Sequence, residues 1–495
     1  MPEAEKPVAP PPPPQDQIVV TQQRVSIGGS EIAYTVTCGT LVLKEEAEKQ
    51  GEAAGTSEGE QARAAIFFIA YTLNDVADLS ERPITFSFNG GPGSASVWLH
   101  LGVLGPYRVL MDEQGAPLPP PYRLTPNDYS LLPSSDLVFI DPVSTGYSRV
   151  VSGEKAQQFH GFKKDIESVG DFIRLYTTRY KRWTSPKYLI GESYGTTRAG
   201  GLAGYLQDRH GMFLNGLMLI SSILNFQTVD VAPGNDLPYL LYLPSYTATA
   251  WFHGQLPPEL QSGPLSAALA AAEAFAQGDY ALALLRGDRL ADQERATIAE
   301  RLAQLTGLSR EYIERSDLRI EIMRFCKELL RAQRRSVGRL DSRFTGIDRD
   351  EAGEHFEHDP SLSNILGPYT ATLYQYVRAE LGFESDLPYE ILSGRVYPWS
   401  YAQHENQYVD VAETMRKAIS ANMHLRVYVA SGYYDLATPY FATEYTFAHL
   451  GLDPSLRQNI SFGYYEAGHM MYIQLSSLAR LRDDLVAFIG GGAAT

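Results

Sequence analysis

The segment Gly191-Glu192-Ser193-Tyr194-Gly195 constrains the fold more than any other part of the chain. It follows an apolar run, 187–190, that is typical of a buried strand. Glycines on both sides of a serine permit the sharp turn from strand to helix that exposes the serine hydroxyl at the edge of a sheet. We therefore expect a helix over 196–206 and a nucleophile at Ser193.

Short apolar runs on both sides of this motif predict the sheet to which the serine belongs. Runs of this length without polar interruption are typical of parallel strands that are buried on both faces. They lie at 84–88, 137–140, 188–190, 217–220 and 426–430, and an apolar stripe over 162–180 predicts a helix between two of them. Alternating strands and helices indicate an α/β protein with a mostly parallel central sheet.

The N-terminal part of the chain has a different composition. Residues 7–14 are nearly all proline, which predicts a flexible tether. Residues 31–44 and 65–73 are rich in β-branched and aromatic side chains and predict two paired strands. The Glu-, Gly- and Ala-rich residues 45–60 have little apolar surface to bury and predict a mobile loop between these strands.

A long segment separates the strand that ends near Ser221 from the strand that begins near Leu425, far longer than one crossover requires. Apolar residues at 298, 302 and 305, and again at 318, 322, 325 and 329, follow helical spacing. We therefore expect a large, mostly helical cap insertion. The predicted organisation is a tether over 1–16, a core over 17–226 and 401–495, and the cap over 227–400.

A serine hydroxyl needs a base beside it and an acid that orients the base. When a serine lies on a turn of this kind, the acid and the histidine follow it in that order along the chain. Asp435 comes directly after the apolar run 427–430, and His469 follows the strand-like residues 460–465. These residues predict a triad of Ser193, Asp435 and His469.

The loop Asn89-Gly90-Gly91-Pro92-Gly93 follows another predicted strand and exposes backbone amides. An oxyanion requires two N–H groups that converge on the developing negative charge. We assign these donors to Gly91 and Tyr194. The alternative interpretation is a tight turn without a catalytic role.

Composition argues against several other classes of protein. Because 58 acidic residues oppose 42 basic ones, the net charge of -16 repels nucleic acids and anionic lipid surfaces. We expect no membrane insertion, since no apolar run of about 18 residues occurs. Cys38 and Cys326 permit at most one disulfide. His355 and His358 lie in an acidic stretch without a third ligand at a fixed spacing, so we expect no metal and no cofactor.

The motifs resemble the serine carboxypeptidases, which combine an Asn-Gly-Gly-Pro-Gly loop with Gly-Glu-Ser-Tyr and a late Gly-His. Residues 141–148 are similar to a further stretch of that family. The resemblance implies an α/β-hydrolase fold and removal of C-terminal residues from peptides through an acyl-enzyme, favoured at acidic pH. It also implies that Asn89, Gly90 and Glu192 bind the carboxylate of the substrate.

The chain departs from the family at several positions. Many members have cysteine where this chain has Ser94, and Trp and Glu where it has Ser87 and Val103. The low cysteine content is typical of a bacterial-type member. The proline tether is compatible with a periplasmic or secreted protein and nearly as compatible with a cytoplasmic tail. The oligomeric state stays open, with a dimer as one possibility.

Three other functions remain open. An esterase or acyltransferase could use the same triad. A proline-releasing aminopeptidase shares the glycine loop, but Asn89 and Glu192 argue against it. An inactive fold used for binding would usually have lost a triad residue, and all three are present.

Overall fold

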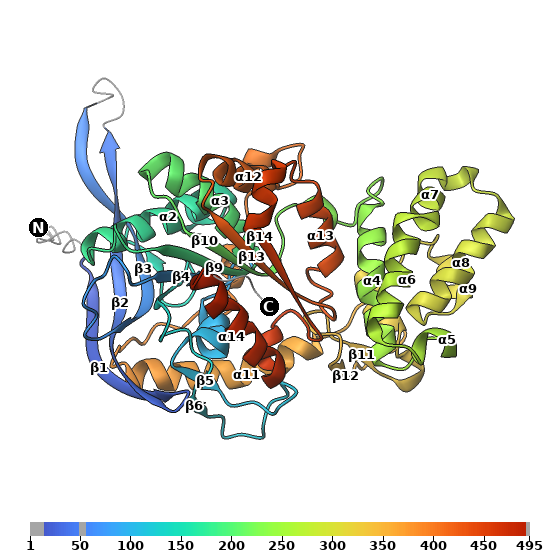
Figure 1. The fold of residues 1–495 in the computed structure, drawn as a ribbon, viewed down its shortest axis with the longest axis horizontal. Coiled ribbons are helices and arrows are strands. Elements are labelled where there is room, and N and C mark those ends of the chain that lie inside the picture. Colours follow the sequence, from blue (N-terminus) through green and yellow to red (C-terminus); the bar gives the residue numbers. More distant parts are fainter. Residues whose placement is uncertain (1–13, 49–55, 492–495) are drawn as a thin grey trace, which may run out of the picture.

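A ten-stranded sheet forms the centre of the protein (Figure 1). The structure is a computed structural model that describes residues 14–48 and 56–491. Its strand order is β1-β2-β3-β7-β4-β9-β10-β13-β14, and β8 pairs with β3. These strands are β1 (Gln17–Ile27), β2 (Ser30–Glu48), β3 (Ser57–Leu73), β4 (Ile84–Phe88), β7 (Asp136–Ile140), β8 (Arg149–Val150), β9 (Lys187–Ser193), β10 (Gly216–Ser222), β13 (Arg426–Gly432) and β14 (Ile460–Tyr465).

The strands from β7 to β14 in this order run parallel, and β1, β2 and β3 extend the sheet in antiparallel pairing. All the predicted apolar runs lie in these strands. Successive side chains of a strand point to opposite faces, so Leu189 enters one hydrophobic cluster and Ile190 the other. The prediction of an α/β protein with a mostly parallel sheet is confirmed.

Helices cover both faces of this sheet (Figure 1). Helices α2 (Phe162–Arg179), α3 (Tyr194–His210) and α12 (Ala412–Ala421) contribute to the apolar cluster on one face. Helices α11 (Pro360–Gln375) and α14 (Leu475–Ile489) contribute to the cluster on the other face. Helix α13 (Tyr440–Ala448) packs in a third apolar cluster. Two small sheets pair β5 (Tyr107–Val109) with β6 (Leu124–Pro126) and β11 (Ser336–Val337) with β12 (Thr345–Gly346).

The hairpin of β2 and β3 is longer than predicted and projects from the body of the molecule (Figure 1). Residues 45–48 and 57–60 belong to the strands, with Glu45 opposite Gln61 and Glu46 opposite Glu60, so the prediction of a loop there is wrong. Antiparallel pairing joins backbone groups whatever the side chains are, which is why a polar composition did not reveal it. Residues 49–55, and residues 1–13 of the predicted tether, lie outside the described residues.

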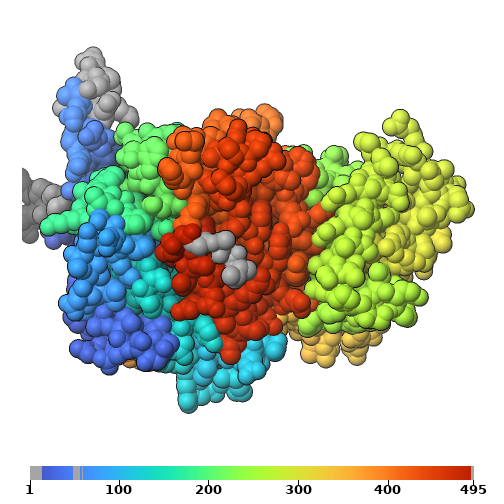
Figure 2. Space-filling view, in the orientation of Figure 1, coloured from blue at the N-terminus to red at the C-terminus, as the bar shows by residue number. Residues whose placement is uncertain are grey.

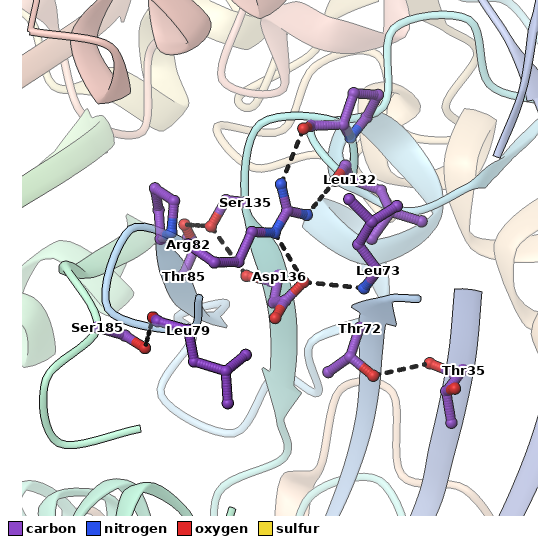
Figure 3. A network of polar contacts seen from close by, with 12 residues as sticks. Thr35, Thr72, Leu73, Leu79, Arg82, Thr85, Leu132, Ser135, Asp136 and Ser185 are labelled. Carbon is purple, nitrogen blue, oxygen red and sulfur yellow. Dashed lines mark hydrogen bonds and ion pairs between the residues drawn. The ribbon is translucent and has the colours of Figure 1, made fainter. Parts of the chain in front are cut away.

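A buried polar network fixes the start of β7 beside the end of β3 and the start of β4 (Figure 3). The Arg82 guanidinium donates to Asp136 Oδ1 at 3.1 Å, and that oxygen also accepts the Leu73 N–H at 3.0 Å. Arg182 forms a second buried ion pair with Asp136. A carboxylate with two cationic partners satisfies its buried charge, which fixes the edge of the sheet where β4 and β7 begin, opposite the edge that carries the glycine loop.

The chain between β10 and β13 is mainly helical. Helices α4 (Leu237–Phe252), α5 (Pro258–Gln261), α6 (Leu265–Gln277), α7 (Asp279–Arg286), α8 (Asp292–Thr306), α9 (Arg310–Arg315) and α10 (Ile322–Glu328) share a third apolar cluster. They form a lobe at one end of the molecule (Figure 2). Residues 298, 302 and 305 lie in α8 as predicted, whereas Leu318 lies before α10 and is not helical.

This insertion has two parts that pack differently. The lobe meets the body through Tyr434, Leu436 and the residues of α13, which share its cluster. In contrast, α11 packs beneath the sheet through Ile365 and Tyr369. Both cysteines are buried and free, so they form no disulfide. Within the residues described, no helix has the length and apolar character needed to cross a membrane.

Candidate active site

Ser193 lies at the junction of β9 and α3, as the motif predicts. Its φ of 59° and ψ of -131° place a non-glycine residue in a strained conformation that is typical of an exposed nucleophile. A Cβ atom on Gly191 would lie 2.2 Å from the Gly195 carbonyl oxygen. The tight turn therefore requires glycine at residue 191, which explains the motif that identified it.

The glycine loop packs directly against this turn. A Cβ atom on Gly90 would lie 2.4 Å from the Tyr194 nitrogen, so only glycine permits such close approach. Gly91 has a φ of 103°, and its N–H donates to no other described residue. The structure therefore brings the loop of Gly91 beside the first amide of α3, where the two predicted oxyanion donors lie on adjacent segments.

Asp435 and His469 are in contact at the edge of one cavity, which His469 lines. The His469 Nδ1 atom lies 2.7 Å from Asp435 Oδ2, and both side chains are buried. Asp435 also accepts the backbone N–H groups of Ala437 and Thr438 and the Thr438 hydroxyl, at 2.7 to 3.0 Å. These bonds fix the carboxylate, and the carboxylate fixes the histidine ring.

The pKa of His469 reflects two opposing effects. Burial alone would lower it, but the charge and hydrogen bond of Asp435, with a further contribution from the charge of Glu192, outweigh burial and raise the pKa above its usual value. Nδ1 is engaged by Asp435, whereas the Nε2 atom makes no hydrogen bond to any described residue. The Ser193 hydroxyl makes no hydrogen bond to any described residue, a geometry that is common before substrate binds.

One cavity of about 360 Å³ collects most of the predicted site residues. Its lining includes Asn89, Gly90, Gly91, Glu192, Ser193 and His469. Asp435 and Tyr194 are buried directly behind it. All eight residues predicted from the sequence are therefore brought to one place.

Glu192 is 3% exposed, and its pKa is raised above the usual value of a glutamate. Burial raises its pKa to about 7, while His469, Tyr472 and Asn89 act to lower it and Asp435 to raise it. The Tyr472 hydroxyl donates a short hydrogen bond to Glu192 Oε2. The carboxyl group can thus be neutral in the pH range where most carboxyl groups are charged.

Asn89 presents an amide to the same corner of the cavity. Its Oδ1 atom accepts the Leu99 N–H at 3.2 Å, but its buried Nδ2 atom has no partner that meets hydrogen-bond geometry. Asn89 nevertheless lies near enough to lower the pKa of Glu192 and that of Tyr472. A buried amide donor without a partner is costly and marks a place for a ligand oxygen.

Tyr472 is a site residue that sequence analysis did not identify. Val103, at the position where many serine carboxypeptidases have Glu, is buried in the apolar core. The Tyr472 hydroxyl supplies the polar partner of Glu192 instead. A Cβ atom on Gly102 would lie 2.4 Å from the Tyr472 ring, so the glycine beside Val103 makes room for it. No local motif marks this pairing.

Arg198 was also not identified. It is 1% exposed, and its guanidinium donates to the Asn89 carbonyl oxygen at 2.6 Å and to both carboxylate oxygens of Asp165 at 2.9 and 3.0 Å. This ion pair joins α2 to α3 and ties the glycine loop to both. Opposite charges on the buried faces of two adjacent helices were the only signal in the sequence.

A short segment of the insertion, residues 339–342, holds the acid and the base together, and we call it the strap. The Leu340 carbonyl accepts the His469 N–H at 2.6 Å, and Asp341 Oδ2 accepts the Gly468 N–H at 3.2 Å. On its other side, the Arg339 carbonyl accepts the Leu436 N–H, and the Ser342 N–H donates to the Tyr434 carbonyl, both at 3.0 Å. The strap therefore bonds to both loops of the predicted acid–base pair.

Asp341 is itself fixed. Its two carboxylate oxygens accept bonds from the Arg343 guanidinium at 2.9 and 2.7 Å, and both side chains are largely buried. A Cβ atom on Gly468 would lie 2.4 Å from Asp341, so the histidine loop and the strap are in close contact. Nothing in the sequence near Asp341 indicates this role.

The acidic stretch near His355 does bring three potential metal ligands together. Ligand atoms of Asp348, Glu357 and His358 lie within 4.8 Å of one another. However, the Lys327 ammonium bonds to Asp348 at 2.7 Å and already neutralises this buried carboxylate. The ion pair accounts for the buried Asp348 carboxylate, and none of the three residues lines the cavity that holds Ser193.

Comparisons with known proteins agree with these motifs. A family model described as serine carboxypeptidase matches residues 48–232. The pheromone-processing carboxypeptidase KEX1 of Saccharomyces cerevisiae is 32% identical over 135 residues, which are 26% of this chain and 17% of that protein. Serine carboxypeptidase-like 33 of Arabidopsis thaliana is 29% identical over 154 residues, which are 30% of each. The match thus spans less than a third of either relative.

The fold comparison extends further. The crystal structure of Kex1(Δ)p, a prohormone-processing carboxypeptidase from Saccharomyces cerevisiae, has a TM-score of 0.54 and covers 92% of this chain and 91% of its own at 16% identity. At this identity the match establishes the fold alone. Over residues 48–232 the chain is thus similar in sequence to the serine carboxypeptidases, and over nearly its whole length it shares the fold of Kex1(Δ)p.

Proposed function

We propose that this protein is a serine carboxypeptidase-like hydrolase that removes C-terminal residues from peptides. The observation that carries the proposal is the buried, unpartnered Asn89 amide beside Glu192, in the same cavity as Ser193. An esterase needs only a nucleophile and an oxyanion site. A carboxypeptidase also needs groups that bind a free carboxylate one residue beyond the scissile bond, and Asn89 and Glu192 are suited to that task.

The proposed chemistry has two stages. Ser193 Oγ attacks the last peptide carbonyl as His469 Nε2 accepts its proton, and the Gly91 and Tyr194 amides stabilise the oxyanion. His469 then protonates the departing amine, which leaves as the free C-terminal residue. Water attacks the acyl-enzyme by the same route, and Ser193 regains its proton. Asp435 orients His469 throughout and stabilises its charged form.

Recognition of the carboxylate sets the pH dependence. Protonated Glu192 can donate a hydrogen bond to the carboxylate of the peptide, whereas ionised Glu192 repels it. Because the pKa of Glu192 is about 7, binding weakens as the pH rises through neutrality. Acylation needs neutral His469, whose raised pKa opposes activity at low pH. We expect the optimum on the acid side of neutrality.

A matched pair of peptides tests this function. KM is measured against pH for one peptide with a free C-terminus and for the same peptide as its C-terminal amide, with products identified by mass. We expect KM for the free acid to climb about tenfold from pH 6 to pH 8, and KM for the amide to stay flatter. Glu192→Gln, which cannot ionise, should flatten the free-acid curve. Identical curves for acid and amide would leave a hydrolase without a carboxylate site.

Two further assignments belong to the same proposal. The division into a core over 17–226 and 401–495 and a cap over 227–400 agrees with an insertion that begins after β10 and ends before β13. A periplasmic or secreted location is consistent with a peptidase that acts on external peptides. Fractionation of cells that express the protein from its native gene tests the location.

A further inference from the structure

Arg339 brings an uncompensated positive charge to the cavity. Among the residues that line it, Arg339 is the one arginine, and no lysine accompanies it. Arg339 is exposed, and its guanidinium has no hydrogen bond or ion pair with any residue in the described ranges, 14–48 and 56–491. Arg198 and Arg343, by contrast, are both committed to carboxylates.

The backbone of Arg339 is held firmly although its side chain is free. Its N–H donates to Asp359 Oδ1 at 3.2 Å, and its carbonyl accepts the Leu436 N–H at 3.0 Å. The residue is thus anchored between the start of α11 and the loop of Asp435. Its charge lies close enough to His469 to oppose the rise in the pKa of that histidine. The Arg339 guanidinium is therefore available to bind a group of the substrate or solvent.

The other ionisable groups of the cavity leave Arg339 without a partner. Glu192 is bonded to Tyr472 and lies in the buried corner with Asn89. Asp359 caps α11 by accepting the Ser361 N–H at 2.9 Å, and the same oxygen accepts the Arg339 N–H. A guanidinium binds carboxylates best, because its planar donors match two carboxylate oxygens at once.

We propose that Arg339 is a specificity-determining residue that binds a carboxylate of the peptide substrate. The proposal rests on the proposed peptidase function. The ligand is either the side chain of Asp or Glu next to the scissile bond or the C-terminal carboxylate itself, and the first is favoured since Asn89 and Glu192 are available to the second. The substrates are then peptides with an acidic residue at one of their last two positions.

The test compares Glu with Gln in blocked peptides that are otherwise identical, at the last position in one pair and at the position before it in another. A third pair with neutral side chains compares the C-terminal acid with the amide. For the wild-type protein we expect kcat/KM to favour Glu over Gln about tenfold in one of the first two pairs. Arg339→Gln should abolish this preference, and Arg339→Glu should invert it, so that the Gln peptide is favoured over the Glu peptide.

Arg335→Gln is the matched control, since Arg335 is an exposed arginine four residues away whose guanidinium, within the described structure, donates only to the Arg334 carbonyl. It should keep every preference of the wild type. If Arg339→Gln instead removes the acid-over-amide preference of the third pair, the C-terminal carboxylate is the ligand. If it changes no preference in any pair, the proposal is wrong.

Binding without turnover separates this proposal from the proposed function. In the Ser193→Ala background, calorimetry gives Kd for the same peptides, with and without Arg339→Gln. If the wild type cleaves no peptide but Kd still shows a tenfold preference that depends on Arg339, this result would support the carboxylate site at Arg339 and overturn the proposed peptidase function. Peptide cleavage with no role for Arg339 would do the reverse. Thermal unfolding of each variant confirms that the fold is intact.

Discussion

The two halves of the predicted triad are held in place by different parts of the chain. Ser193 lies in a region, 84–210, whose strands and helices contact one another directly and whose glycines permit the close approach of the loop at 89–93. Asp435 and His469 lie on loops that depend on the strap, which belongs to the insertion.

The region around Ser193 is stabilised by contacts within itself, whereas the loops of Asp435 and His469 are stabilised by contacts with the insertion. The nucleophile region has its own buried ion pair, Arg198 with Asp165, and a turn that its glycines shape. The acid–base region takes four of its hydrogen bonds from residues nearly a hundred or more positions away in the sequence. Damage to the insertion should therefore affect the alignment of His469 before it affects Ser193.

The largest effect is expected from Ser193→Ala. Removal of the nucleophile should lower kcat by about 10⁴-fold or more and leave peptide binding and the fold unchanged, because little core volume is lost. Rates are measured with a peptide of free C-terminus, and binding by calorimetry. More than a few per cent of residual activity would mean that another residue is the nucleophile.

Arg198→Met tests whether the nucleophile region is self-contained. The change leaves the buried Asp165 carboxylate without a partner, so the free energy of unfolding should fall by about 3 to 5 kcal/mol. Urea unfolding measures this loss. The exposed pair of Arg310 and Glu314 provides the control, and Arg310→Met should cost less than about 1 kcal/mol. Equal losses in the two variants would contradict a structural role for Arg198.

Asp341→Ala tests whether the strap positions His469. Loss of the bonds to Gly468 and Arg343 should displace His469 and lower kcat about 100-fold, with a smaller change in KM. Asp341→Asn keeps an acceptor for the Gly468 N–H and should retain more activity. Asp350→Ala is the control, since among the described residues the Asp350 carboxylate accepts only the nearby backbone N–H groups of Ala352 and Gly353. An equal loss of kcat in the control would refute the role of the strap.

The smallest effect concerns Tyr472→Phe. The Tyr472 hydroxyl lowers the pKa of Glu192, so its removal should raise that pKa and keep Glu192 protonated to higher pH. His469, Asp435 and Tyr369 also face Glu192 and are unchanged. At about pH 7.5, KM for free-acid peptides should fall about threefold, whereas the amide should not respond.

Tyr369→Phe is the control for this change. Tyr369 is a buried tyrosine near Glu192 that makes no hydrogen bond to the Glu192 carboxyl group in the described structure, so its loss should leave the KM–pH curve in place. A shift of the Tyr472→Phe curve to lower pH would mean that the hydroxyl stabilises the neutral form of Glu192 instead.

The sequence by itself determined the parts of this protein that local rules govern. A serine between two glycines at the end of a strand is typical of a sharp turn into a helix, so the turn of Ser193 could be predicted. Apolar runs without polar interruption are buried, so the sheet and the positions of Asp435 and His469 after their strands could also be predicted. The polar hairpin at 45–60 could not, because antiparallel pairing uses backbone groups that every residue carries.

Tertiary structure alone decided which distant side chains complete the site. The Tyr472 hydroxyl reaches Glu192 across 280 positions of the chain, and the Asp341 carboxylate reaches Gly468 across 127. Neither contact leaves a periodicity or a local motif, because a hydrogen bond depends on distance and angle in space and not on spacing in sequence. The sheet and the turn of Ser193 could thus be predicted from the sequence, whereas the strap, the partner of Glu192 and the free charge of Arg339 in the cavity could be seen only in the folded structure.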